Sequence, residues 1–305
     1  MVKCEVKIGD AVFKNFVFTA SGTFGYGDEY EDIFDPALLG GICSKGLTRF
    51  PREGNPPPRL TETPSGLLNS VGLQNMGVEA FLEKKIPELV KKKVTVIANI
   101  AGNTLEEFQE MTALCDKAGG ITAVELNVSC PNVKEGGMAF GVNEEHIRSI
   151  TAACRAATTK ALIVKLSPNV TDITAMAGAA LEGGADALTV ANTLLGMAVD
   201  VDKRAPSIAN VFAGLSGPAI KPVALRLVYQ VKKSFPEATI MASGGIVSPR
   251  DALEFFMAGA SAVQIGTGLF RDPELPLHVL EGVKEFCVEN GFPSVGAVTG
   301  LAIRR

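Results

Sequence analysis

Short apolar segments alternate with amphipathic stretches along the whole chain. Between the short segments, apolar residues recur at the spacing of a helix that buries one face. A closed parallel barrel requires eight βα units, so the pattern predicts an α/β fold, a (β/α)8 TIM barrel. The predicted strands are 16–20, 41–45, 94–99, 122–127, 162–166, 187–191, 239–243 and 262–266.

Turn and capping residues mark further elements. Gly9-Asp10 separates two alternating segments, 4–8 and 11–13, and predicts an N-terminal β-hairpin that plugs one end of the barrel. Helices are expected to begin at Asn103-Thr104, at Asn143, at Thr171-Asp172 and at Ser248-Pro249, where a side chain can cap the first turn.

Two long insertions, 46–77 and 192–217, each follow the end of a predicted strand. They look irregular, and loops of this length in a compact domain usually serve as lids or binding elements. The composition shows no break, so residues 1–305 are expected to form one barrel domain with these long βα-loop insertions.

The composition narrows the class of protein. The formal net charge is -4 and the only basic cluster is Lys91-Lys92-Lys93, which argues against binding to nucleic acid or to a membrane surface. The six cysteines contain no C-x-x-C pair, so neither a disulfide scaffold nor a metal site is expected. No signal-like or membrane-spanning apolar run is present, and a cytoplasmic location is expected.

Polar or glycine residues close all eight predicted strands. In a barrel these ends meet at one rim, where active sites of this fold lie. The last two ends are glycine-rich, 242-ASGGI-246 and 264-QIGTGLF-270, and backbone N–H groups of such loops bind phosphate. The phosphate could belong to a substrate or to a cofactor such as FMN.

Two lysines, Lys45 and Lys165, also close strands, and each should point into the barrel mouth. Such a lysine could form a Schiff base with a carbonyl substrate, or supply a fixed charge opposite an electron-rich cofactor. Asn99 and Asn127 add uncharged donors and acceptors, which suit a planar, amide-bearing ring.

Cys130 stands in the polar stretch 123-AVELNVSCPNVKEGG-137. From the residues alone it could be a nucleophile, a base, a metal ligand or an inert buried thiol. The missing C-x-x-C spacing weakens the metal hypothesis, and with only His146 and His278 in the chain a thiol–histidine nucleophile is weakened too. A base requires only a thiol that can lose its proton near the reacting carbon.

These motifs, in this order, resemble the class 1 dihydroorotate dehydrogenases. The residues that carry the resemblance are SKG at 44–46, NSVGLQN at 69–75, NVSCPN at 127–132, Lys165, ANT at 191–193, SGGI at 243–246 and IGTG at 265–268. The length, the N-terminus and the NVKEGG continuation are most similar to the class 1B catalytic subunit, as distinct from the fumarate-reducing class 1A.

The resemblance implies an FMN enzyme that oxidises (S)-dihydroorotate to orotate in pyrimidine biosynthesis, with hydride transfer to the flavin and Cys130 as the base that removes a proton from the substrate. Substrate-binding positions would be Lys45, Asn69, Ser70, Val71, Gly72, Leu73, Asn127, Asn192 and Thr193. FMN-binding positions would be Ser21, Lys45, Gly46, Asn99, Asn127, Lys165, Ala191, Gly217, Gly244, Gly245, Gly266 and Thr267.

The resemblance also implies a partner. Class 1B enzymes pass electrons to NAD through a subunit that carries FAD and a [2Fe–2S] cluster, and a homodimer of this chain within a heterotetramer would follow. Three alternatives stay open: a class 1A-like enzyme, a barrel aldolase or isomerase that uses Lys165 as a Schiff base, and a flavin-carrying subunit without catalysis. A relative acting on dihydrouracil is disfavoured by the NSVGLQN insertion.

Overall fold

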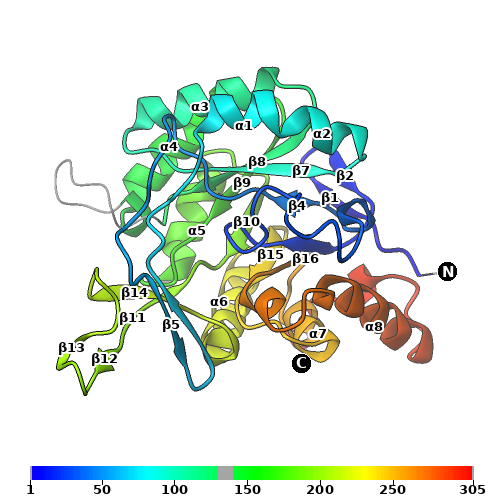
Figure 1. Ribbon diagram of the computed structural model, residues 1–305. Helices are drawn as coiled ribbons and strands as arrows, with labels where there is room; N and C mark the ends of the chain where they lie inside the picture. Colours follow the sequence, from blue (N-terminus) through cyan, green and yellow to red (C-terminus); the bar gives the residue numbers. More distant parts are fainter. Residues whose placement is uncertain (1, 130–139, 304–305) are drawn as a thin grey trace.

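Eight parallel strands form a closed barrel in the computed structural model, which describes residues 2–129 and 140–303 (Figure 1). Hydrogen bonds join the strands in the order β3-β16-β15-β10-β9-β8-β7-β4, and a parallel bridge between Phe18 and Gly41 closes the ring. The predicted (β/α)8 fold is therefore confirmed. The barrel strands are β3 (Val17–Thr19), β4 (Ile42–Cys43), β7 (Val96–Ile100), β8 (Ile121–Asn127), β9 (Ala161–Lys165), β10 (Ala187–Val190), β15 (Thr239–Ser243) and β16 (Ala262–Ile265).

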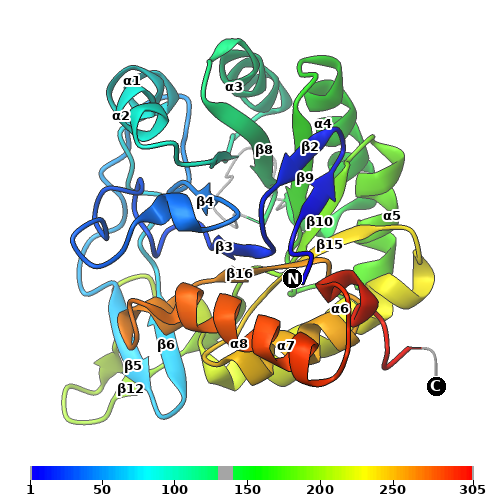
Figure 2. The same cartoon turned by 90° about the vertical axis from the view of Figure 1, so that its right-hand side faces the viewer.

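Helices surround this barrel on its outer face (Figure 2). In the third helix Phe108, Met111, Thr112 and Cys115 are buried, which is the i, i+3, i+4, i+7 spacing of one apolar stripe. The helices are α1 (Val78–Lys84), α2 (Ile86–Lys91), α3 (Leu105–Lys117), α4 (Glu144–Ala156), α5 (Ile173–Glu182), α6 (Lys221–Ser234), α7 (Pro249–Met257) and α8 (Leu275–Glu289). Short 3₁₀ turns are Pro36–Leu38, Phe140–Val142, Pro218–Ile220, Thr267–Phe270 and Val295–Ala297.

The predicted helix starts are confirmed by their caps. The side chains of Thr104, Asn143, Asp172 and Ser248 each accept a hydrogen bond from a backbone N–H in the first turn of α3, α4, α5 and α7. Each cap satisfies a donor that the helix itself leaves unpaired.

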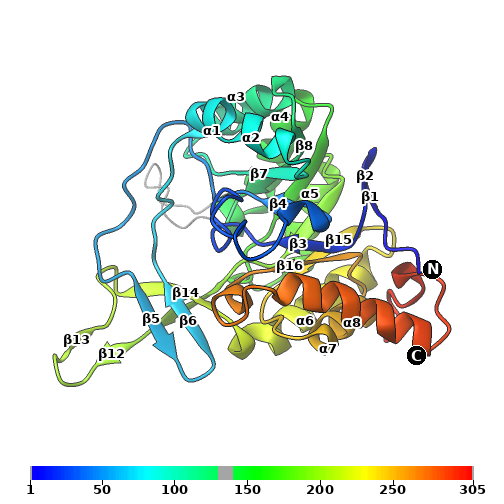
Figure 3. The same ribbon diagram turned by 45° about the vertical axis from the view of Figure 1, so that its right-hand side comes forward.

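The N-terminal hairpin is also confirmed. Strands β1 (Val6–Ile8) and β2 (Ala11–Phe13) pair antiparallel around Gly9, whose φ is 55°. Phe13 is buried and packs edge-on against Phe18 of β3, with 5.1 Å between ring centroids. The hairpin lies at the end of the barrel where the strands begin, near both chain termini (Figure 3).

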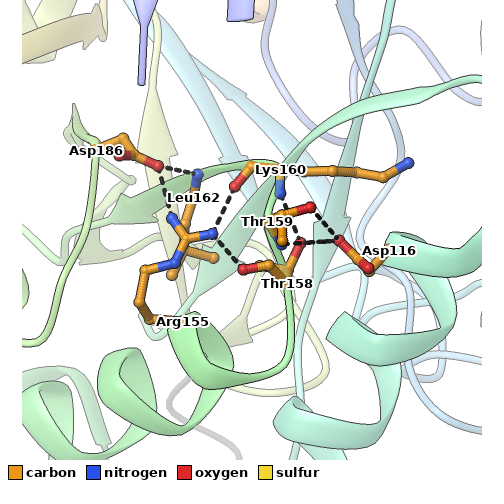
Figure 4. A network of polar contacts seen from close by, with 7 residues as sticks. All are labelled: Asp116, Arg155, Thr158, Thr159, Lys160, Leu162 and Asp186. Carbon is orange, nitrogen blue, oxygen red and sulfur yellow. Dashed lines mark hydrogen bonds and ion pairs between the residues drawn. The ribbon is translucent and has the colours of Figure 1, made fainter. Parts of the chain in front are cut away.

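A polar cluster fixes the start of β9 at that end (Figure 4). Asp186 accepts hydrogen bonds from Arg155 and from the backbone N–H of Leu162, both at 2.8 Å. Arg155 also donates to the carbonyls of Thr158 and Lys160. The cluster thereby ties the end of α4 to the strand that follows it.

The prediction that the two insertions are irregular was wrong. They pair with each other in a four-stranded antiparallel sheet of order β11-β14-β6-β5, with Asn69 opposite Gly214 (Figure 1). The insertion strands are β5 (Leu60–Thr63), β6 (Gly66–Asn69), β11 (Leu194–Met197) and β14 (Phe212–Ser216), with a small ribbon of β12 (Val199–Asp200) and β13 (Ala205–Pro206). Strands β5 and β6 form a local hairpin, whereas the pairing of β6 with β14 joins the two insertions across about 145 positions.

Candidate active site

A cavity of about 830 Å³ lies at the carboxyl ends of the barrel strands, between the barrel and the insertion sheet. Its size lies in the range of pockets that hold small ligands and cofactors. Every substrate-binding position named from the sequence lines it, from Lys45 and Asn69 to Thr193. The lining FMN positions are Ser21, Lys45, Gly46, Asn127, Lys165, Ala191, Gly217, Gly244, Gly245, Gly266 and Thr267.

Two of the predicted residues do not appear in the lining. Asn99 is fully buried below the cavity, where its Nδ2 donates to Glu125 at 2.7 Å. Cys130 lies outside the described residues, as do Pro131 to Gly137 of the loop that should carry it. Its described neighbour Ser129 lines the cavity and donates to the carbonyl of Lys165 at 3.0 Å.

The glycine-rich end of the cavity has an unusual backbone. Gly217, Gly244 and Gly245 have φ angles of 93°, 127° and 77°, a region that favours glycine. Thr267, at the end of β16, donates to the Ser216 hydroxyl at 2.7 Å and so joins the second insertion to this end. Closely approachable backbone N–H groups of this kind suit a phosphate.

Amide side chains line the opposite part. Asn192 donates to Asn127 Oδ1 at 3.3 Å and accepts from the N–H of Thr193 at 2.8 Å. Asn69 donates to the carbonyl of Gly214 in the paired insertion strand. These contacts fix the orientation of each carboxamide, so the wall presents a defined set of donors and acceptors.

Two cations give this wall a positive charge. Burial, and then the neighbouring Arg59, lower the pKa of the Lys45 ammonium below its usual range. Arg59 is held by a hydrogen bond to Gln74 at 2.8 Å. An anionic group such as a carboxylate would be stabilised between these two side chains.

Neither histidine of the chain lines the cavity. Within residues 2–129 and 140–303, no group of three or more histidine, cysteine or acidic side chains is arranged to hold a metal ion. None of the helices in the described part of the chain is long and apolar enough to cross a membrane.

Comparison with known proteins identifies the family. The family model described as dihydroorotate dehydrogenase matches residues 3–287. The chain belongs to the dihydroorotate dehydrogenase family. A Thermoanaerobacter protein named dihydroorotate dehydrogenase B (NAD(+)), catalytic subunit, is 52% identical over 296 residues, 97% of each chain. A protein of the same name from Desulforamulus reducens is 52% identical, over 97% of each chain. Another from Bacteroides thetaiotaomicron is 48% identical, over 98% of this chain and 99% of its own.

Dihydroorotate dehydrogenases are flavin-dependent oxidoreductases. Two features of the cavity suit a phosphorylated flavin. The glycine backbone at one end suits its phosphate. The buried Asn99 Oδ1 has no hydrogen-bond partner among the described residues, and a Cβ atom on Gly46 in the cavity wall would lie 3.2 Å from it. An unsatisfied buried acceptor at this place matches an N–H donor of a bound ring.

Several lining residues were not found from the sequence. The most notable is Arg59, beside Lys45; the others include Asn55, Gln74, Asn169, Ser216 and Phe212. Arg59 and Gln74 belong to the first insertion and are joined by a hydrogen bond at the cavity wall. A lone arginine after Pro56-Pro57-Pro58 carries no local signal of such a role.

Proposed function

We propose that this chain is the FMN-containing catalytic subunit of an NAD-linked dihydroorotate dehydrogenase, which oxidises (S)-dihydroorotate to orotate in pyrimidine biosynthesis. The observation that carries the proposal is that one cavity contains both a glycine cradle suited to phosphate and an amide-lined wall with two cations. The names of the relatives support the reaction and the NAD-linked subtype.

The cofactor would lie between the glycine loops and the barrel rim. Gly244, Gly245, Gly266 and Thr267 would bind its phosphate, and Lys165 would place a positive charge beside its pyrimidine edge. When bound, FMN supplies the hydride acceptor.

The substrate would lie against the amide wall. Asn69, Asn127 and Asn192 would bind the ring, and Lys45 with the backbone of 70–73 would bind the carboxylate. Cys130 would act as the general base that removes the proton from C5 while the C6 hydride leaves. A thiol base is consistent with a cavity that no histidine lines.

The test combines cofactor analysis with two substitutions. The purified protein should be yellow and release FMN on denaturation. Cys130→Ala should abolish dihydroorotate oxidation with an artificial acceptor while retaining FMN, and Cys130→Ser should leave slow activity. The matched control is Cys4→Ala, a half-buried thiol outside the cavity, which should keep full activity. Full activity of Cys130→Ala would refute the assigned base.

The partner assignment needs a separate experiment. The name "catalytic subunit" of the relatives supports a separate electron-transfer subunit, which we infer carries FAD and [2Fe–2S] in a heterotetramer built on a homodimer of this chain. NAD reduction should require that subunit. Rapid turnover of the isolated chain with fumarate would instead assign class 1A, and borohydride trapping of substrate on Lys165 would favour the aldolase.

A further inference from the structure

A layer of polar side chains lies inside the barrel beneath the cavity. Its centre is Glu125 of β8, which is fully buried. Barrel interiors of this fold are mostly filled with branched apolar side chains, so a carboxylate here needs an explanation. It accepts hydrogen bonds from four other strands: from Cys43 at 3.2 Å, Asn99 at 2.7 Å, Thr189 at 2.6 Å and Gln264 at 2.6 Å.

Lys165 lies one layer above this carboxylate. In the register of β8 and β9, Asn127 is opposite Lys165 and Glu125 is opposite Ile163, so the two charged residues occupy successive positions on the inner wall. Lys165 is only 5% exposed, and its ammonium has no ion-pair partner within 4.0 Å among the described residues. A buried ammonium needs a counter-charge, because the loss of hydration otherwise favours its neutral form.

The charge state of Glu125 agrees with that role. Burial acts to raise the pKa of Glu125, but the charge of Lys165 and the hydrogen bonds from Thr189, Gln264 and Cys43 outweigh it and lower the pKa. Cys43 is the other titratable group that faces this carboxylate. Burial and then Glu125 raise the pKa of the Cys43 thiol well above its usual value, so it remains a neutral donor. The remaining donors are uncharged.

The carboxylate also determines how two amides are oriented. Asn99 and Gln264 each direct an NH₂ group to Glu125, and within the part of the chain that the structure describes the oxygen of each has no hydrogen-bond partner. The free oxygen of Asn99 is the one beside Gly46 in the cavity wall. With its NH₂ group bonded to Glu125, Asn99 therefore directs its buried carboxamide oxygen toward the side of Gly46.

We propose that Glu125 is a positioning residue of the active site: as a buried carboxylate it supplies the counter-charge for the ammonium of Lys165 and holds the carboxamide oxygen of Asn99 toward the bound flavin. Without that charge, the ammonium would lose its counter-ion and Asn99 could turn either way. The orientation of Asn99 toward a flavin rests on the proposed function, whereas the pairing of the Glu125 and Lys165 charges does not.

Thermal unfolding of the flavin-free protein tests the charge pair. Glu125→Gln and Lys165→Met should each lower the unfolding midpoint by several degrees, because each leaves one buried charge uncompensated. The double variant, in which both charges are removed at similar volume, should be more stable than Glu125→Gln, even if that single variant fails to fold at neutral pH. A double variant no more stable than Glu125→Gln would overturn the pair.

The pH dependence separates charge from packing. In Lys165→Met the folded-state pKa of Glu125 should lie above its unfolded value, so stability relative to the wild type should rise as pH falls. Glu125→Asp keeps the charge and should show no such slope. Parallel pH profiles for Lys165→Met and Glu125→Asp would refute the inference.

Flavin binding tests the positioning of Asn99. Quenching of flavin fluorescence by the flavin-free protein should show FMN binding about two- to tenfold weaker in Glu125→Gln than in the wild type, the difference expected for one neutral hydrogen bond. The same substitution should have a smaller effect in an Asn99→Ala background. An equal effect in both backgrounds would remove Asn99 from the inference. If the wild type binds no FMN, the proposed function fails while the unfolding result still decides the charge pair.

Discussion

Replacement of Gly245 by alanine is the smallest change that tests the phosphate cradle. The residue has a φ of 77°, and an added Cβ would lie 2.7 Å from Lys221 Cβ and 2.9 Å from the Gly217 carbonyl oxygen. The left-handed backbone alone costs an alanine about 1–2 kcal/mol. Because a backbone oxygen is among the close atoms, the loop must also shift, and its N–H groups shift with it.

The expected effect on binding follows from the hydrogen bonds that this shift disturbs. A hydrogen bond to a charged group contributes about 1.5–3 kcal/mol, so the loss of one from the phosphate should weaken FMN binding by about 10- to 150-fold. Riboflavin lacks the phosphate and should lose much less. The assay is fluorescence titration of the flavin-free protein with FMN and with riboflavin.

Gly291→Ala is the matched control. Gly291 has a φ of 70°, no neighbouring atom lies within 4 Å of its Cβ position, and it does not line the cavity. The control should lose about 1–2 kcal/mol of stability from the same backbone strain and keep its FMN affinity. If Gly245→Ala weakened FMN and riboflavin by the same factor, this loop would not be the phosphate cradle.

Two further predictions concern the substrate wall and the far end of the barrel. Burial and Arg59 lower the pKa of Lys45, so the KM for dihydroorotate should rise with pH below the pH range in which lysine usually titrates. Lys45→Met should have a high KM that does not rise in this way. If the wild type and Lys45→Met had the same pH profile, Lys45 would not bind the carboxylate. Asp186→Ala removes the counter-charge of the partly buried Arg155 and leaves the N–H of Leu162 unpaired. Urea unfolding should show a loss of about 2 kcal/mol, against less than about 0.5 kcal/mol for the exposed Asp202→Ala.

The barrel could be predicted because its signals are local. Parallel strands that are buried on both sides appear in sequence as continuous apolar runs, as in Val96–Ile100 and Ala161–Lys165, where every residue is buried. Caps such as Thr104 and Asn143 act within their own helix turn. The strand-end residues then follow from the fold, since all such ends meet at one rim.

The joining of the two insertions into one sheet could not be predicted, because β6 and β14 lie far apart along the chain, whereas the β5–β6 hairpin is local and was missed. Asn69 and Gly214 are paired across 145 positions. Gly66 lies so close to this partner strand that a Cβ atom would be 2.1 Å from the Ser216 carbonyl oxygen. The residues next to Gly66 in sequence give no indication that only glycine fits there. Arg59 is held within its own insertion, by Ser70 and Gln74, but its sequence context gives no signal that it lies beside Lys45.

Glu125 shows the same limit at the level of one side chain. Its two-residue spacing from Asn127 predicts that both point into the barrel, because side chains alternate along a strand. A carboxylate pointing inward is costly unless it is hydrogen-bonded and opposed by a positive charge. Its donors Cys43, Thr189 and Gln264 come from strands spread across more than 200 residues of sequence, so only the closed barrel brings them together. The cavity therefore depends on the buried polar layer around Glu125, whose residues are not expected to contact the substrate. Substitutions in that layer should change the stability of the protein and its affinity for the cofactor as well as the rate of turnover.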